Sequence, residues 1–142
     1  MSSLSSKIFR AIIIVLGLLN IFVGINVGFG GIATLGLQGQ TEFFEVTNEN
    51  IFFMRDSHIR FLGGLYGGIG LFLILAATNL NKYQTALRLI FAVIFVGGLA
   101  RFTMMRFDVI FGQDILTSVL VELILMPVLY VWSSRILKSN IE

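Results

Sequence analysis

Four long apolar runs divide the chain, and their length predicts helices that cross a lipid bilayer. The clearest run extends from residue 11 to residue 33 without a charged side chain. A hydrocarbon core of about 30 Å requires roughly 20 apolar residues in a helix, so this run is long enough. Shorter apolar runs follow at residues 61–77, 87–99 and 115–132. Extended to helix length, the four runs predict membrane spans at about 8–31, 59–78, 86–101 and 115–134.

Short connections between the later runs predict how the helices are arranged. Residues 79–85 and 102–114 leave little room between neighbouring spans, which favours antiparallel neighbours. We therefore predict an all-α integral membrane protein, a four-transmembrane-helix antiparallel bundle that forms a single membrane domain over residues 1–142. The longer connection, residues 34–58, is expected to be an outer loop with an interfacial or helical lid. Within it, Asn48 is a reasonable N-cap, so the second helix is expected to begin outside the hydrocarbon.

Composition supports a membrane environment and narrows the possible chemistry. Hydrophobic residues make up 56% of the chain and charged residues only 13%, whereas a soluble domain carries about 25% charged residues. Disorder is excluded because disordered chains are poor in apolar residues, and this one has 14 phenylalanines. The absence of cysteine excludes disulfides, thiol nucleophiles and zinc–thiolate sites. A length of 142 residues accommodates four spans but not six.

The distribution of lysine and arginine predicts the orientation. The side with both termini and the 79–85 turn carries six basic residues, and the other side carries four. Because cytoplasmic loops are enriched in Lys and Arg, both termini are expected to be cytoplasmic. Arg88 and Arg101 would lie at the two ends of the third span and extend to the membrane surface. The first span also resembles a secretory signal peptide, but its apolar run is longer than a signal core, so we expect it to be retained.

Glycines recur at helical spacing and predict close contact between helices. Small residues three or four positions apart share one helix face and allow two backbones to approach in lipid. The predicted packing glycines are Gly24, Gly28, Gly63, Gly64, Gly67, Gly68, Gly97 and Gly98. Two neighbouring stripes on the second helix leave two interpretations open. In the first, the small residues serve tight packing within the chain. In the second, they form an interface between subunits, and two stripes on one helix leave room for both.

A carboxylate inside the fourth span is the strongest candidate for a functional residue. Glu122 lies about 10 Å below the outer boundary at 1.5 Å per residue, where a charge facing lipid is costly. Arg60 begins the second span and Arg101 ends the third, so in an antiparallel bundle both are expected to approach Glu122. Further members of the predicted polar cluster are Ser118, Arg55, Asp56 and His58.

Three interpretations of this cluster remain open. It is a structural ion-paired clasp, since removing one partner of a buried pair is strongly destabilising. Alternatively, it is a proton- or ion-coupled site in which Glu122 titrates. The third interpretation is a docking site for an anionic lipid headgroup or another acidic ligand, which the excess of arginine favours over ion coupling.

Catalysis, cofactors and nucleic acid receive no support from the sequence. The chain has no nucleophile beside a histidine base, no glycine-rich phosphate loop followed by lysine, and no pair of histidines at metal spacing. The outer acidic residues do not match the spacing of a calcium loop. Its basic residues are scattered, which argues against nucleic-acid binding. We therefore expect no enzyme activity, no cofactor and no metal site.

Three segments carry a resemblance to a known family. They are RFLGGLYGGIG at 60–70, GGLARF at 97–102, and a fourth-helix Glu122 followed by Pro127. Together they resemble a family of small four-helix bacterial membrane proteins classed as a domain of unknown function, similar in layout to the DoxX-like group. The resemblance implies the bacterial inner membrane, a homo-oligomer with a trimer preferred, and a role in envelope maintenance.

A second family of four-helix membrane proteins fits less well. Small multidrug exporters carry their essential glutamate in the first helix, where this chain has Asn20 and Asn26. We therefore expect a non-catalytic inner-membrane homo-oligomer that contributes to envelope homeostasis by binding phospholipid or an anionic ligand at the Arg/Glu cluster. A small proton- or ion-coupled transporter or channel that uses Glu122 is the alternative.

Overall fold

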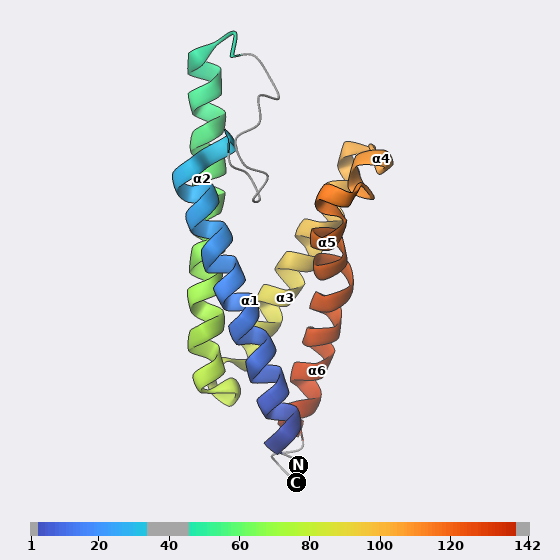
Figure 1. Ribbon diagram of the computed structural model, residues 1–142. Coiled ribbons are helices and arrows are strands. Elements are labelled where there is room, and N and C mark those ends of the chain that lie inside the picture. The colour runs from blue at the N-terminus through green and yellow to red at the C-terminus, as the bar shows by residue number, and fades with distance from the viewer. Residues whose placement is uncertain (1–2, 34–45, 139–142) are drawn as a thin grey trace. The chain divides into compact units, whose positions relative to one another are not determined.

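The computed structural model describes residues 3–33 and 46–138, and every regular element in these two stretches is helical (Figure 1). The elements are α1 (Ser3–Gly30), α2 (Glu49–Thr78), α3 (Leu80–Ala100), η2 (Arg101–Met104), α4 (Phe107–Ile110), α5 (Gln113–Leu120), the π-helical turn η3 (Val121–Leu125) and α6 (Met126–Lys138). Within the described stretches, four segments are long and apolar enough to span a membrane: Leu4–Ala33, Glu49–Thr78, Leu80–Met104 and Gln113–Ile136. This confirms the prediction of an all-α chain with four candidate spans, and it suggests a multi-pass membrane protein.

Helix capping explains where two of the helices begin. The Asn48 side chain accepts a hydrogen bond from the backbone N–H of Ile51 at 3.1 Å, so α2 begins at Glu49, as its N-cap predicts. Residues 49–58, assigned to the outer loop from sequence, are therefore helical, and the rest of the predicted lid, residues 34–45, lies outside the described residues. Asn79 caps α3 in the same way by accepting from Lys82 N at 3.1 Å.

The early start of α3 corrects the expected position of Arg88. This arginine lies eight residues after Leu80, which places it about 12 Å along the helix rather than at its end. The charge-free run begins near Leu87, but Asn79 caps the helix eight residues earlier. A helix begins where its first N–H groups find a partner, and that point need not coincide with the start of its apolar run.

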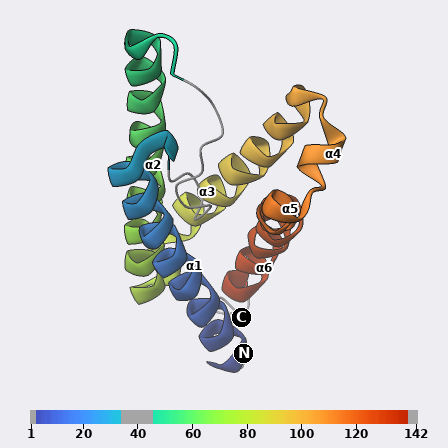
Figure 2. The ribbon, with the colours of Figure 1, turned by 45° about the horizontal axis from the view of Figure 1, so that its top comes forward.

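The chain divides into two compact units. Residues 11–77 form the α1–α2 unit, and residues 1–10 together with 78–142 form the α3–α6 unit. The first turns of α1 therefore belong with α3 and α6, while the rest of α1 belongs with α2 (Figure 2).

Glycines allow the backbones of α1 and α2 to touch. A Cβ atom on Gly24 would lie 2.7 Å from Gly67 Cα, and one on Gly63 would lie 2.7 Å from Gly28 Cα. Both distances are shorter than real Cβ contacts, so these positions accept only glycine without a shift of the backbone. The contacts run in opposite sequence directions along the two helices, so α1 and α2 are antiparallel.

The second glycine stripe is different. A Cβ atom on Gly64 or Gly68 would meet nothing within 4 Å. The same is true of Gly67 in the first stripe and of Gly97 on α3, but the backbone of Gly67 lies where a Cβ on Gly24 would be. The tight contacts of α2 therefore use one of its two stripes. The role of the other stripe in packing, including the subunit interface considered from sequence, stays a prediction.

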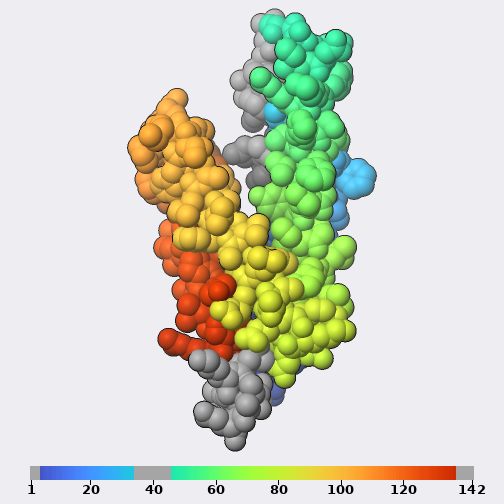
Figure 3. Space-filling model, turned by 180° about the vertical axis from the view of Figure 1, so that it is seen from behind, coloured from blue at the N-terminus to red at the C-terminus, as the bar shows by residue number. Residues whose placement is uncertain are grey.

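In the α3–α6 unit, side chains rather than bare backbone fill the space between helices. The Phe9 ring packs edge-on against Phe91 and Trp132, with centroids 6.5 Å and 5.5 Å apart. Trp132 Nε1 donates to Ser5 Oγ at 3.0 Å, which ties α6 to the start of α1. The side chains of α3 and α6 are in direct contact in Figure 3, where α3 is yellow and α6 is red.

Most apolar side chains of the candidate spans remain on the surface of the chain. No more than 28% of the apolar window of any span is buried. Large exposed residues such as Phe29, 82% exposed, and Phe61, 65% exposed, occur along the helices. A surface of this kind is stable against lipid tails and unstable in water, in agreement with the membrane assignment.

Candidate functional site

Glu122 forms a two-bond ion pair with Arg101. Arg101 Nε donates to Glu122 Oε2 at 2.6 Å, and its Nη2 donates to Oε1 at 2.7 Å. Parallel bonds between a guanidinium fork and both oxygens of a carboxylate are the strongest geometry for such a pair. The arginine side chain is 32% exposed and the glutamate side chain 14% exposed, so the pair is reachable from one side.

Two local features of the chain bring Glu122 to Arg101. A Cβ atom on Gly98 would lie 2.8 Å from Glu122 Cβ and 2.9 Å from Leu123 Cδ2, so the glycine opens the space that the fourth span enters. The turn that carries Glu122 is π-helical, and Met126 N donates to Val121 O across it.

Proline accounts for the change in helical winding. Pro127 lacks an N–H, and its ring excludes the carbonyl oxygen four residues earlier, so the regular α-helical bond cannot form there. A π-helical turn, which carries an extra residue, takes its place. The Glu–Pro pair noted in the sequence is therefore a structural unit in which the proline shapes the turn that presents the glutamate.

Arg60 takes part in a different ion pair. Its Nε donates to Asp56 Oδ2 at 2.6 Å, and its Nη1 donates to the carbonyls of Gly28 and Phe29 at the end of α1. Asp56 in turn accepts from Ile32 N at 2.8 Å. The two charges together close the C-terminal end of α1, where carbonyls and turn N–H groups otherwise lack partners.

The predicted cluster is therefore distributed between the two units. Arg101 and Glu122 meet in the α3–α6 unit, and Arg60 binds Asp56 in the α1–α2 unit. The spacing of Asp56 and Arg60, four residues apart on one helix, was a signal in the sequence that favours this pair. Arg55, His58 and Ser118, the other proposed members, have exposed side chains.

Arg88, which was expected at the end of the third span, is a half-buried cation with an aromatic partner. Its Nη2 donates to the hydroxyl of Tyr130 at 2.9 Å, and its guanidinium carbon lies 4.4 Å from the centre of the Tyr130 ring. Its Nε is buried without a hydrogen-bond partner among the described residues. An aromatic ring and a hydroxyl therefore take the place of a carboxylate beside this arginine.

A third arginine–carboxylate pair lies in the connection between the third and fourth spans. Arg106 donates from Nε and Nη2 to the two oxygens of Asp108 at 2.9 Å and 2.6 Å. These hydrogen bonds lower the pKa of the Asp108 carboxyl from its usual 3.8 to about 2. Both side chains are more than 60% exposed, so the pair contributes little to stability.

Comparisons with known proteins give one result. The chain matches the model of a domain of unknown function (DUF4345) over residues 8–133, while no curated protein and no solved structure matches it. Among the described residues, no three His, Cys, Asp or Glu side chains are placed to hold a metal ion. The match confirms the resemblance to a family classed as a domain of unknown function, whereas the likeness to the DoxX-like group stays a prediction. Because the match covers most of the 142 residues, the chain belongs to the DUF4345 family.

Proposed function

We propose that this protein is a non-catalytic membrane protein that binds an anionic lipid headgroup or another acidic ligand at Arg101. In the absence of the ligand, the Glu122 carboxylate accepts the hydrogen bonds of Arg101. The observation that supports the proposal is the geometry of the pair. The two parallel bonds from Arg101 to the Glu122 carboxylate are the bonds that an arginine also makes to a phosphate. A ligand oxyanion would replace the carboxylate without changing the arginine.

Partial exposure and the π-helical turn make the exchange physically reasonable. Arg101 is accessible at the end of its span, where lipid headgroups lie, and 32% of its side chain is exposed. Glu122 sits on a turn whose hydrogen bonds are already irregular, so its movement disturbs few regular helical bonds. In the same proposal the protein is a homo-oligomer, with a trimer preferred, in the bacterial inner membrane with both termini cytoplasmic, where it contributes to envelope maintenance.

The exchange predicts opposite effects for two substitutions. Glu122→Gln removes the competing charge and is expected to raise the amount of bound phosphatidylglycerol. Arg101→Gln is expected to lower it by about tenfold, because the variant loses hydrogen bonds to a charged group, which contribute roughly 1.5–3 kcal/mol. Binding is measured by native mass spectrometry of the purified chain in mixed phosphatidylglycerol and phosphatidylcholine nanodiscs.

A matched control is available outside the span. Asp108→Asn frees Arg106 in the same way as Glu122→Gln frees Arg101, but at an exposed site, and should leave lipid binding unchanged. If both Arg101→Gln and Glu122→Gln lower the melting temperature while bound lipid stays constant, the pair is a structural clasp and the proposal is wrong.

The same pair supports a second candidate function, a proton- or ion-coupled transporter or channel. Glu122 is an ionisable group inside a candidate span with 14% of its side chain exposed. This function requires a flux in proteoliposomes that depends on a proton or ion gradient and that Glu122→Gln abolishes. A flux equal to that of empty vesicles would exclude it.

A further inference from the structure

The α3–α6 unit has a strongly basic end. It is formed by residues 3–10, 78–88 and 130–138, which are joined by contacts such as Phe9 with Trp132 and Arg88 with Tyr130. These three stretches contain no aspartate or glutamate. Their basic residues are Lys7, Arg10, Lys82, Arg135 and Lys138, together with Arg88, which lies about 12 Å further along α3. The positive charge at this end is therefore not balanced within these stretches, in contrast to the paired arginines near Glu122 and Asp108.

A polar groove of about 320 Å³ opens at this basic end. Arg10 and Ser6 line it from α1, and Asn79 and Asn81 line it from the start of α3. Leu80 and Ile136 form its apolar floor and are 5% and 2% exposed. Thr78 also lines the groove, which therefore combines one guanidinium, two amides and two hydroxyls, all of which can donate hydrogen bonds.

The donors of this groove are largely unused within the described chain. Asn79 Oδ1 accepts from Lys82 N, which leaves its amide nitrogen without a partner among the described residues. Arg10, Asn81 and Ser6 likewise have no hydrogen-bond or ion-pair partner among those residues. The positive end of the 21-residue helix α3 lies at the same place. Several unused donors around one space are the arrangement that binds an oxyanion.

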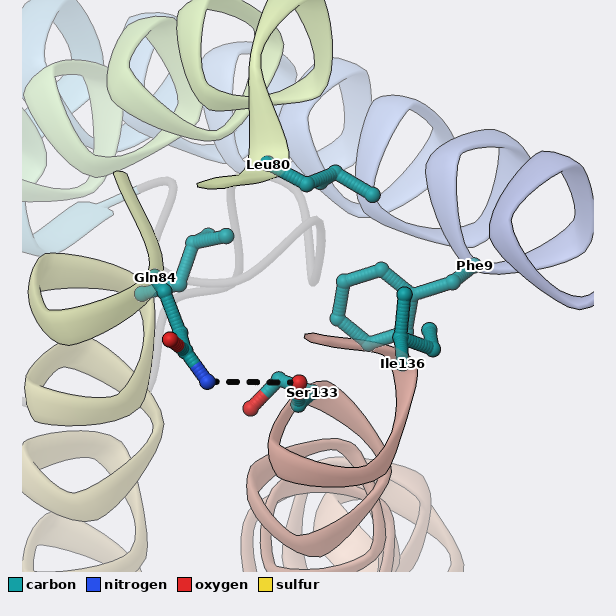
Figure 4. Close-up of a pocket in the computed structure, with 6 residues that line it drawn as sticks. Phe9, Leu80, Gln84, Ser133 and Ile136 are labelled. Atoms are coloured by element: carbon teal, nitrogen blue, oxygen red, sulfur yellow. Dashed lines mark hydrogen bonds between the residues drawn. The ribbon is translucent and has the colours of Figure 1, made fainter. Parts of the chain in front are cut away.

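The floor of the groove is closed, so a ligand stays at the surface. Figure 4 shows Leu80, Ile136 and Phe9 gathered around a gap too small for a water molecule. Gln84 Nε2 donates to Ser133 O across this gap at 3.5 Å. The site therefore suits a headgroup that rests on the surface, and nothing penetrates to the core beneath it.

We propose that this groove binds the phosphate of an acidic phospholipid. Four candidate spans have an end here, those that begin at Leu4 and Leu80 and those that end at Thr78 and Ile136, which places the groove at the membrane surface. Leu4 and Ile8, next to the groove residues on α1, are 61% and 45% exposed and would contact the acyl chains. A free phosphate offers the same oxygens but makes no use of this apolar surface. The site lies at the opposite end of α3 from Arg101 and does not rest on the proposed function.

Two variants and one control test this site. The full-length chain in neutral detergent is titrated with dihexanoyl phosphatidylglycerol, and bound lipid is counted by native mass spectrometry. Arg10→Gln is expected to weaken binding by about tenfold, and Asn81→Ala by about threefold, because the guanidinium adds charge–charge attraction to its hydrogen bonds with the phosphate, whereas the amide is neutral. Lys82→Gln is the control, because it removes the same charge at the same end from an exposed side chain that does not line the groove.

Three results would overturn the proposal. Equal weakening by Arg10→Gln and Lys82→Gln would mean that overall charge attracts the lipid and the groove does not. Equally tight binding of dihexanoyl phosphatidylcholine would remove the role of the acidic headgroup. Sodium phosphate that displaces the lipid with the same affinity would identify free phosphate as the ligand. Circular dichroism of each variant tests whether unfolding causes the loss of binding. If Arg10→Gln misfolds, the comparison of Asn81→Ala with the Lys82→Gln control decides whether the groove binds the lipid.

Discussion

The two units of this protein associate their helices in different ways. In the α1–α2 unit, glycines at positions such as Gly24 and Gly63 bring one backbone against the other. In the α3–α6 unit, aromatic rings, a tyrosine beside Arg88 and the Arg101–Glu122 pair fill the space between helices. Lipid tails provide no hydrophobic drive for helix association, so the chain relies on close van der Waals contact in one unit and on polar and aromatic contacts in the other.

The units also use their ion pairs differently. Asp56 and Arg60 belong to one helix and close the end of another, so their role is to satisfy backbone groups. Arg101 and Glu122 instead join the third and fourth spans directly through their two-bond contact. Of the two pairs, the second is therefore the better candidate for exchange with a ligand.

The largest expected effect separates the two stripes of α2. Gly63→Ala places a methyl group against the backbone of Gly28 and is expected to lower the free energy of unfolding by about 3 kcal/mol. Gly64→Ala has open space and better helix propensity, so it is expected to be neutral or stabilising by up to about 1 kcal/mol. Both are measured by unfolding in mixed dodecyl sulfate micelles. Destabilisation by Gly64→Ala would show that something packs on the second stripe and would support a subunit interface.

A smaller effect is expected at the corresponding pair on α3. Gly98→Ala meets Leu123 Cδ2, a side-chain end that can move, and Glu122 Cβ, which moves only with its own backbone, so the expected loss is about 1.5 kcal/mol. Gly97→Ala, with nothing within 4 Å, is the matched control and should not destabilise. The same unfolding assay compares them. A loss at Gly98 as large as that at Gly63 would contradict the distinction between backbone packing and side-chain packing.

The smallest effect is expected at Asp108. The pKa of Asp108 in the folded chain, about 2, lies below the usual 3.8. The pair with Arg106 therefore adds to the free energy of unfolding above pH 3.8, and this contribution is lost as the pH falls through about 2. Carbon-detected NMR of the carboxyl group should report this titration. Since both side chains are exposed, Asp108→Asn should leave the melting temperature at neutral pH unchanged. A clear drop would show that surface pairs hold the α3–α6 unit as well.

Part of the candidate site was predictable from sequence and part was not. Glu122 stood out because a carboxylate inside an apolar run needs a partner, and Arg101 was among the partners named. The assignment of Arg60 to Asp56 depended on where α1 ends, since Arg60 binds carbonyls of Gly28 and Phe29 that sequence spacing alone does not place. The charge-free run alone places Arg88 at a helix end, whereas the cap at Asn79 starts α3 earlier and places Arg88 within the helix.

The sequence by itself determined the membrane character, the helical content and the number of candidate spans, because each depends on local composition and on the length of apolar runs. Only the tertiary structure decided which glycine stripe carries the contact between α1 and α2, since Gly63 and Gly64 are neighbours with the same chemistry. The tertiary structure also decided which carboxylate pairs with which arginine. The Arg101–Glu122 pair depends on distances of 2.6–2.7 Å between atoms of separate elements, and these distances are set by packing and not by order along the chain.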